Sequence, residues 1–458
     1  MGGAQNKAKI EGTIMELSTR KVLDKAFSGT GFFSLLLMCA ALVILLGPIF
    51  IKGSTAFFFN ETVEGREYKL ETFNRGNAGK LHEELSRAEK ARKPVYEMLE
   101  KYDREIGWTD MKKRKALDSI KAKVRKLLGP LPGENTPALP REQYGQTRWD
   151  RAQAHLHNLL YREEYVFENS GELGKKVYKP RRDKFKGTSL EPLFTYFEEN
   201  LDKMLLPRRK FYWRFLFDPP EDAYFFGGIW PSFLGTLYLT IGTMIVAAPI
   251  GIISAIYLTQ YAGENLFVSF LRSCISTLAG VPSVVFGLFG LAFFINTLPV
   301  FDGKSVVVGC FTLALLVLPT VIRASEEAIL AVPRAYKEAS LGLGATQWHT
   351  ISKVILPAAL PGIITSIIIS MGRAAGETAP ILFTAAVTQG GALSFGEIFS
   401  QSSPALPVSI YSIVTVHRQV EEVRHVQYGM VMSLVSLVLI LNIVAIIMRA
   451  KISYKLRG

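Results

Sequence analysis

The chain has 458 residues, a formal net charge of +13 and 49% hydrophobic residues. The apolar residues form long runs after residue 229 and one run near the N-terminus, which indicates a polytopic membrane protein rather than several soluble domains. In such a protein a basic excess sets orientation and attracts anionic lipid. No arginine-rich helix with interleaved aromatic residues stands out, so the charge does not favour nucleic-acid binding.

The cysteines and histidines do not predict a metal site. His155 and His157 are two positions apart and would point to different faces of a helix. The polar region 52–228 lacks cysteine and therefore has no intrachain disulfide. The three cysteines all lie in apolar runs: Cys39, Cys274 and Cys310. We expect no bound metal and no cofactor.

The first apolar run, Gly31–Ile51, carries no charge and is long enough to cross a hydrocarbon core of ~30 Å. A cleaved signal peptide is the alternative, but its apolar core would be shorter, and here about 30 mostly polar residues precede the run, which ends at Phe50-Ile51 before Lys52. We therefore expect an uncleaved first span. The predicted spans are 31–51, 229–258, 270–296, 305–322, 358–387 and 428–448.

Basic residues near the span ends predict the orientation. An even number of spans places both ends on one side, and both the segment 1–30 and the tail 449–458 are basic. The positive-inside bias puts them in the cytoplasm, together with the basic segment 323–357. The polar region 52–228 then lies outside, and a long translocated domain is exempt from the charge rule.

The region 52–228 is predicted to be a mostly helical extracytoplasmic domain, with a charged, partly disordered loop as the alternative. Its helical candidates are about 78–105, bent or broken at Pro94; a segment that Thr109 or Asp110 caps and Gly129-Pro130 ends; and about 145–165. Leu131–Pro140 is read as a proline-rich connector.

The cytoplasmic segment between the fourth and fifth spans predicts a short helix, a glycine turn and a second short helix stopped by proline. Its sequence resembles the EAA loop of ATP-binding-cassette importer permeases, in which this element binds the ATPase. The residues at matching spacing are Glu338, Ala339, Gly344, Leu356 and Pro357. Ser340 replaces the second alanine of that pattern and Val354 replaces its isoleucine.

Two charged residues stand in the fifth span, where charges are costly and seldom face lipid. Arg373 and Glu377 are four apart, so one continuous helix would let them pair. Together with hydroxyl residues they form a predicted polar stripe, typical of the wall of an aqueous path: Ser366, Ser370, Arg373, Glu377, Pro380 and Thr384. The alternative is a buried ion pair that only fixes helix packing.

The segments 278–290, 318–323 and 371–380 resemble the PstA-type permeases of bacterial phosphate importers, and the resemblance covers about 229–448. It implies an all-α polytopic membrane protein with the type I ABC importer permease fold. It also implies that Arg323 and Arg373 line the phosphate path with Glu377 as partner. Ser370 and Thr384 are assigned to the path as members of the polar stripe. For Arg323 an interfacial anchor is an equal reading.

Two features depart from the resemblance. Many relatives have glutamate where this chain has Gln260, which we expect to have a minor effect. Most relatives also lack so large a domain between the first two spans. The sequence does not assign this domain a function, and docking of a binding protein is one hypothesis.

The resemblance also implies partners and a location. Because the chain has no Gly-x-x-x-x-Gly-Lys-Ser/Thr loop, ATP must bind to another subunit. The implied partners are a PstB-type ATPase dimer, a PstC-type permease and a PstS-type periplasmic phosphate-binding protein, at the bacterial inner membrane. A permease for sulfate or molybdate and a phosphate-sensing scaffold remain as alternatives. A membrane enzyme is disfavoured, because no paired base and nucleophile appears in the spans.

Overall fold

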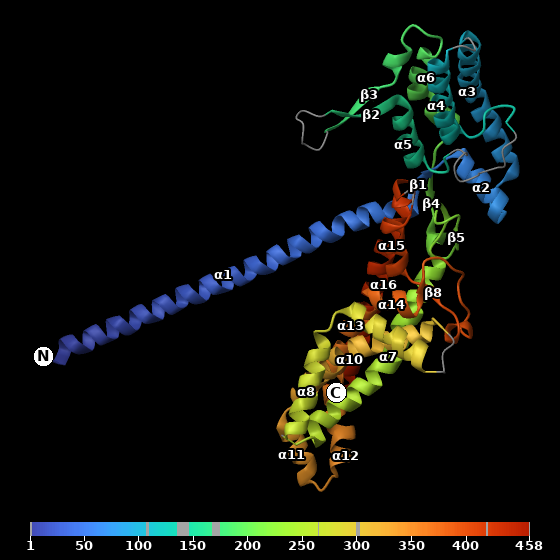
Figure 1. Cartoon of the computed structure of the whole chain (residues 1–458). Helices are drawn as coiled ribbons and strands as arrows, with labels where there is room; N and C mark the ends of the chain where they lie inside the picture. The colour runs from blue at the N-terminus through green and yellow to red at the C-terminus, as the bar shows by residue number, and fades with distance from the viewer. Residues whose placement is uncertain are drawn as a thin grey trace.

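The computed structural model describes residues 2–106, 110–134, 146–166, 175–263, 265–298, 303–417 and 420–457. An inserted domain stands at one end of the molecule, a bundle of apolar helices forms the other end, and a long N-terminal helix projects from the junction between them (Figure 1). The predicted mostly helical class holds for these residues, with four small two-stranded sheets added.

The inserted domain follows helix α1 (Gly2–Phe57) and is built mainly from helices around one apolar core. The largest buried side chains of this core include Leu117, Leu159, Phe194 and Phe197. The domain helices and strands are α2 (Val63–Phe73), α3 (Ala78–Glu105), α4 (Met111–Leu128), α5 (Trp149–Leu160), β2 (Tyr161–Val166), β3 (Lys175–Pro180), η1 (Arg182–Phe185) and α6 (Glu191–Leu205).

The local sequence explains the domain helices, with two differences from prediction. Asp110 caps α4 by accepting from the Lys113 amide, and Gly129 ends it; the alternative cap, Thr109, lies outside the described residues. The predicted break at Pro94 is wrong, because α3 continues through it. The helix predicted over 145–165 is instead α5 followed by strand β2, which pairs antiparallel with β3. Most of the proposed proline-rich connector is not described.

A narrow stem joins the domain to the membrane portion. Strand β1 (Phe58–Glu61) leaves the end of α1 and pairs antiparallel with β4 (Arg208–Phe211), which returns the chain toward the bundle. Between them and the bundle lie η2 (Trp213–Leu216), β5 (Pro220–Glu221) and β6 (Phe226–Gly227).

Within the described residues, the membrane portion contains five helices long and apolar enough to cross a bilayer, and a sixth span if a bent pair counts as one. The helices are α1 (Gly2–Phe57), α7 (Trp230–Ile256), α8 (Leu266–Ala279), α9 (Ser283–Gly290), α10 (Val306–Leu330), α11 (Arg334–Gly342), α12 (Gln347–Thr350), α13 (Leu356–Gly376), α14 (Ala379–Thr384), α15 (Leu406–Thr415) and α16 (Val420–Arg457). Shorter elements are η3 (Tyr257–Tyr261), η4 (Leu291–Thr297), η5 (Ile351–Ile355), η6 (Glu397–Phe399), β7 (Ala386–Val387) and β8 (Ser403–Pro404).

The predicted third span, 270–296, is not one straight helix. It divides into α8 and α9–η4, which meet at an angle of 101°. The break lies at Gly280-Val281-Pro282, where proline disfavours helical geometry at the residue before it. A six-span topology therefore requires this bent pair to act as a single crossing.

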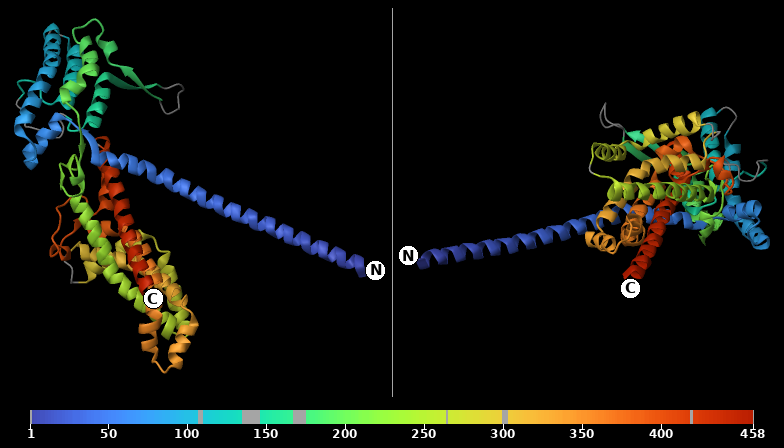
Figure 2. Two further views of the ribbon diagram at one scale, coloured as in Figure 1. Left: turned by 180° about the vertical axis from the view of Figure 1, so that it is seen from behind. Right: turned by 90° about the horizontal axis from the view of Figure 1, so that it is seen from below.

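Helix α1 meets the bundle only near its C-terminal end. Its apolar residues from Val22 to Leu45 are exposed, and the helix extends away from the other elements in both views of Figure 2. Gly53 permits close contact with α16, since a Cβ there would lie 2.6 Å from Met432 Cβ. The closest packing of α1 is thus at the level of the stem.

Candidate permeation path and coupling element

Arg373 stands in the last turn of α13 and makes two long polar contacts. Its Nε lies 3.5 Å from Glu377 Oε1, and its Nη1 lies 3.5 Å from Thr320 Oγ1 on α10. Both distances are at the limit of hydrogen bonding, so the planar guanidinium keeps donor capacity for an anion. The Arg373 side chain is 39% exposed in this subunit. Such an arginine can bind an oxyanion bidentately.

The prediction that Arg373 and Glu377 share one continuous helix is wrong, although their ion pair forms. Helix α13 ends at Gly376, Glu377 is extended with ψ of 132°, and the separate α14 begins at Ala379. Pro380 has no amide to donate, and it stands where α14 starts, a position that accepts proline. The side chain of Glu377 returns to Arg373 from this non-helical turn.

The hydroxyl residues of the predicted stripe are packed inside the bundle. Ser366 lies 3.3 Å, oxygen to oxygen, from Ser325 of α10. Ser370 and Thr384 are fully buried, and Thr384 donates to the Pro380 carbonyl. The structure therefore does not place these residues with Arg373 on one exposed helix face. A role for Ser370 and Thr384 in the path stays a prediction.

Arg323 lies within α10 rather than at its end, because this helix continues beyond the predicted span to Leu330. The Arg323 guanidinium is exposed and donates to the Ser276 hydroxyl of α8. Thr320 is three residues earlier on the same face of α10. The sequence analysis did not single out Thr320 or Ser276. For Thr320 the available signal was its spacing of three residues from Arg323, and for Ser276 it was a hydroxyl group in the preceding predicted span.

The segment predicted to bind the ATPase forms a helical hairpin at the end of the bundle farthest from the inserted domain (Figure 1). Glu338 and Ala339 are exposed on α11. Gly344 has φ of +84° and makes the turn, a conformation that favours glycine. Thr346 then caps α12 by accepting from the His349 amide.

The prediction that proline stops the second helix of this hairpin is wrong. The helix runs from Gln347 to Gly376 as one apolar unit that includes α12, the π-turn η5 and α13. Pro357 stands in the first turn of α13, which begins at Leu356 where the π-turn ends. A π-turn locally changes the backbone hydrogen-bond register, which accommodates a residue without an amide proton.

Gln260, which we expected to matter little, connects the hairpin to the end of α7. Its side-chain oxygen accepts from Lys337 Nζ at 2.9 Å, and its backbone carbonyl accepts from Gln347 Nε2 at 2.7 Å. Within the hairpin, Ser340 and Thr350 are joined by a hydroxyl contact of 2.9 Å. These contacts fix both helices of the hairpin to the transmembrane bundle.

The tip of the hairpin, around the turn at Gly344, exposes large apolar side chains. Leu343 is 90% exposed and Trp348 is 64% exposed. Exposed aromatic and apolar residues on a rigid, polar-rimmed element are typical of a protein-binding surface.

Known proteins match the part of the chain that carries these features. The family described as binding-protein-dependent transport system inner membrane component matches residues 247–458. The chain is 34% identical over 230 residues to phosphate transport system permease protein PstA 1 of Mycobacterium tuberculosis (strain ATCC 25618 / H37Rv), covering 50% of this chain and 71% of that protein. The chain belongs to the PstA family of ABC importer permeases. It is thus a multi-pass membrane permease, as predicted.

Other relatives of this permease share shorter segments. It is 39% identical over 180 residues to the probable ABC transporter permease protein YqgI of Bacillus subtilis (strain 168), or 39% of this chain and 60% of that protein. It covers 62% of PstA from Mycobacterium leprae at 37% identity, so these two relatives are matched over less than two thirds of their length. Among solved structures, the MetNI methionine ABC transporter in an inward-facing conformation gives a TM-score of 0.38 at 17% identity, covering 49% of this chain and 94% of that one.

Proposed function

We propose that this permease forms the membrane path of an ATP-driven importer of inorganic phosphate. The observation that carries the proposal is Arg373, an exposed guanidinium at the end of a transmembrane helix whose contacts with Glu377 and Thr320 are both long. Arginine remains charged at any working pH and its fork matches an oxyanion. The curated relatives named as phosphate permeases support phosphate as that oxyanion.

Arg323 extends the proposed path toward the hairpin end of the bundle. It stands one turn beyond Thr320 on α10, and both side chains lie on the same helix face. An ion moving along this face would pass from Arg373 to Arg323. The incomplete pairing of Arg373 suits transport, because a permeation site must bind its ion weakly enough to release it.

The proposed partners follow from the two ends of the molecule. The hairpin α11–α12 would dock on a cytoplasmic PstB-type ATPase dimer, with Glu338 and the exposed tip as contacts. A PstC-type permease would complete the path, and a PstS-type binding protein would deliver phosphate on the opposite side. In this orientation both termini are cytoplasmic, the inserted domain is extracytoplasmic, and the chain itself hydrolyses nothing.

The test of the proposal is substrate-stimulated ATPase activity in the complex reconstituted with its own ATPase, partner permease and binding protein. Phosphate-loaded binding protein should stimulate hydrolysis, whereas sulfate and molybdate should not. If binding protein loaded with sulfate or molybdate stimulates hydrolysis and phosphate-loaded binding protein does not, the permease transports another oxyanion. If phosphate signalling persists in an Arg373→Gln variant that has lost uptake, the chain also acts as a sensing scaffold.

A further inference from the structure

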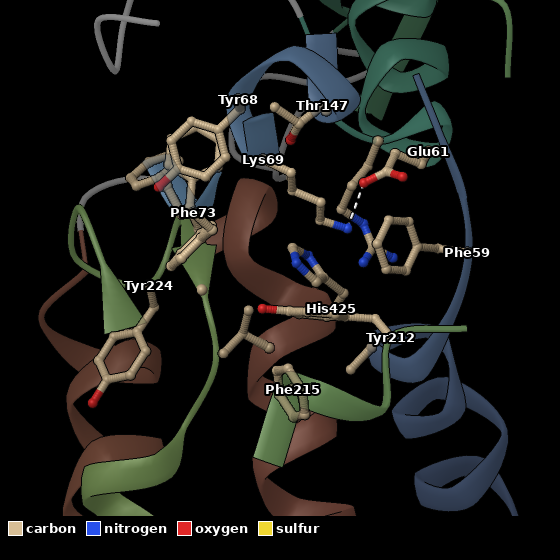
Figure 3. A pocket seen from close by; sticks show the side chains of 17 residues that line it. Phe59, Glu61, Tyr68, Lys69, Phe73, Thr147, Tyr212, Phe215, Tyr224 and His425 are labelled. Atoms are coloured by element: carbon tan, nitrogen blue, oxygen red, sulfur yellow. Dashed lines mark ion pairs between the residues drawn. The ribbon is translucent and has the colours of Figure 1, made fainter. Parts of the chain in front are cut away.

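Packed side chains of the stem, of α2 and of α16 join the inserted domain to the bundle, in addition to the chain connections of the stem. Figure 3 shows side chains from the stem, from α2 and from α16 around a cavity. The volume of this cavity is about 60 Å³. Lys69 pairs with Glu61, and its Nζ lies 4.7 Å from the ring centroid of Tyr212. Arg148 lies over the Phe59 ring at 4.0 Å. These contacts between cations and aromatic faces favour one orientation of the stem.

Beside this junction, one carboxylate of α16 is held by two side chains of the domain. Arg151 Nε donates to Glu422 Oε2 at 3.0 Å, and His155 Nε2 contacts Glu422 Oε1. Arg151 and His155 are four apart and therefore share a face of α5. The side chains of Arg151, His155 and Glu422 are only 10%, 14% and 20% exposed. We call these three residues the clamp.

Helix α16 extends from the clamp to the candidate permeation path. It packs along α13, where Val438 Cγ1 would lie 3.7 Å from a Cβ built on Gly372. Gly372 directly precedes Arg373. A displacement of the outer end of α16 would therefore be transmitted by one continuous helix to the neighbour of Arg373, because packed helices move as rigid elements.

We propose that the clamp couples the inserted domain to the permeation path through α16, so that Glu422, Arg151 and His155 are positioning residues for transport. Binding of a partner to the domain would shift the outer end of α16 and, through it, the surroundings of Arg373. The transport part of this inference rests on the proposed function, whereas the clamp itself does not.

The experiment uses the complete complex, in a chain whose three native cysteines are replaced by alanine. Spin labels are attached at Gln153→Cys on α5 and Thr415→Cys on α15. Glu422→Gln should broaden the distance distribution between the labels and reduce ATPase stimulation by loaded binding protein about two- to thirtyfold. The basal ATPase rate should be retained. The ATP-driven change in label distance should also be smaller than in the parent complex.

Glu421→Gln is the matched control, because Glu421 is 77% exposed and pairs with Arg424 of its own helix. It should leave both readouts unchanged. The double variant Arg151→Glu with Glu422→Arg forms the pair with its charges exchanged. It should restore the narrow distance distribution and the ATPase stimulation if Glu422→Gln acts through lost pairing rather than misfolding. An unchanged distance distribution in Glu422→Gln would refute the clamp. A loosened domain with full stimulation and a normal ATP-driven change would refute the coupling. If the parent complex ignores phosphate, the proposed function fails while the label distances still test the clamp.

Discussion

Arg92 is the residue whose replacement should most clearly destabilise the inserted domain. It is 8% exposed and pairs with Glu64, which is 2% exposed. Its Nε and Nη2 donate to the Met204 carbonyl at 3.0 and 2.7 Å, and its Nη1 donates to the Leu128 carbonyl at 3.3 Å. One side chain thus ties the ends of α4 and α6 to α3 and α2.

Arg92→Met would leave a buried carboxylate and two carbonyls without this donor. Breaking a buried pair by removing one partner costs about 3–5 kcal/mol. For a domain of this size each kcal/mol shifts the melting temperature by roughly 2–4 °C, so we expect a loss of about 6–20 °C. Domain unfolding can be followed in detergent by limited proteolysis against temperature.

The control is Arg104→Met on the same helix. Arg104 is 80% exposed and pairs with Glu100 one turn away, so its loss should cost less than about 0.5 kcal/mol.

Burial raises the pKa of Glu64, and Arg92 opposes that rise. Without Arg92 the pKa of Glu64 in the folded state rises further above its unfolded value. The Arg92→Met variant should therefore lose stability as the pH rises through the folded-state pKa of Glu64, and its stability should be less impaired at pH about 5 than at pH about 8. Equal melting temperatures for Arg92→Met and Arg104→Met would refute the stabilising role of the buried Arg92–Glu64 pair.

Two further predictions concern the hairpin and helix packing. Glu338→Ala should uncouple transport from hydrolysis while phosphate capture by the binding protein is unchanged; normal uptake in this variant would remove Glu338 from the ATPase contact. Gly235→Val should prevent correct packing of α7, because even a Cβ would lie 2.0 Å from the Pro404 carbonyl oxygen. Gly47→Val, where nothing lies within 4 Å, should assemble normally, and the comparison is the yield of monodisperse complex after size exclusion; equal yields would contradict the packing argument.

Local signals predicted much of the fold. Asp110 and Gly129 bounded α4 because capping and helix termination depend on a few neighbouring residues. The glycine turn at Gly344 was predictable for the same reason. Proline was the less reliable signal: α3 continues through Pro94, whereas the chain breaks before Pro380. Tertiary packing decides which of these outcomes a proline produces.

Contacts between distant segments were not predictable from one sequence. The clamp joins Glu422 to Arg151 across 271 positions, and no local pattern indicates such a pair. Likewise, Thr320 gained significance only when α10 was found beside Arg373. The candidate path could thus be located to a helix from its charges, while its neighbours required the structure.

The proposed phosphate path requires Arg373 to bind the transported oxyanion, and phosphate uptake by the Arg373→Gln complex measures this requirement. Loss of a hydrogen bond to a charged group costs about 1.5–3 kcal/mol, so uptake should fall roughly 10- to 150-fold. Basal ATPase activity and the affinity of the binding protein for phosphate should be retained. Arg449→Gln, at the basic end of α16, should transport normally. Uptake by the Arg373→Gln complex within about twofold of the parent, a change worth less than 1 kcal/mol, would show that Arg373 does not bind the transported ion.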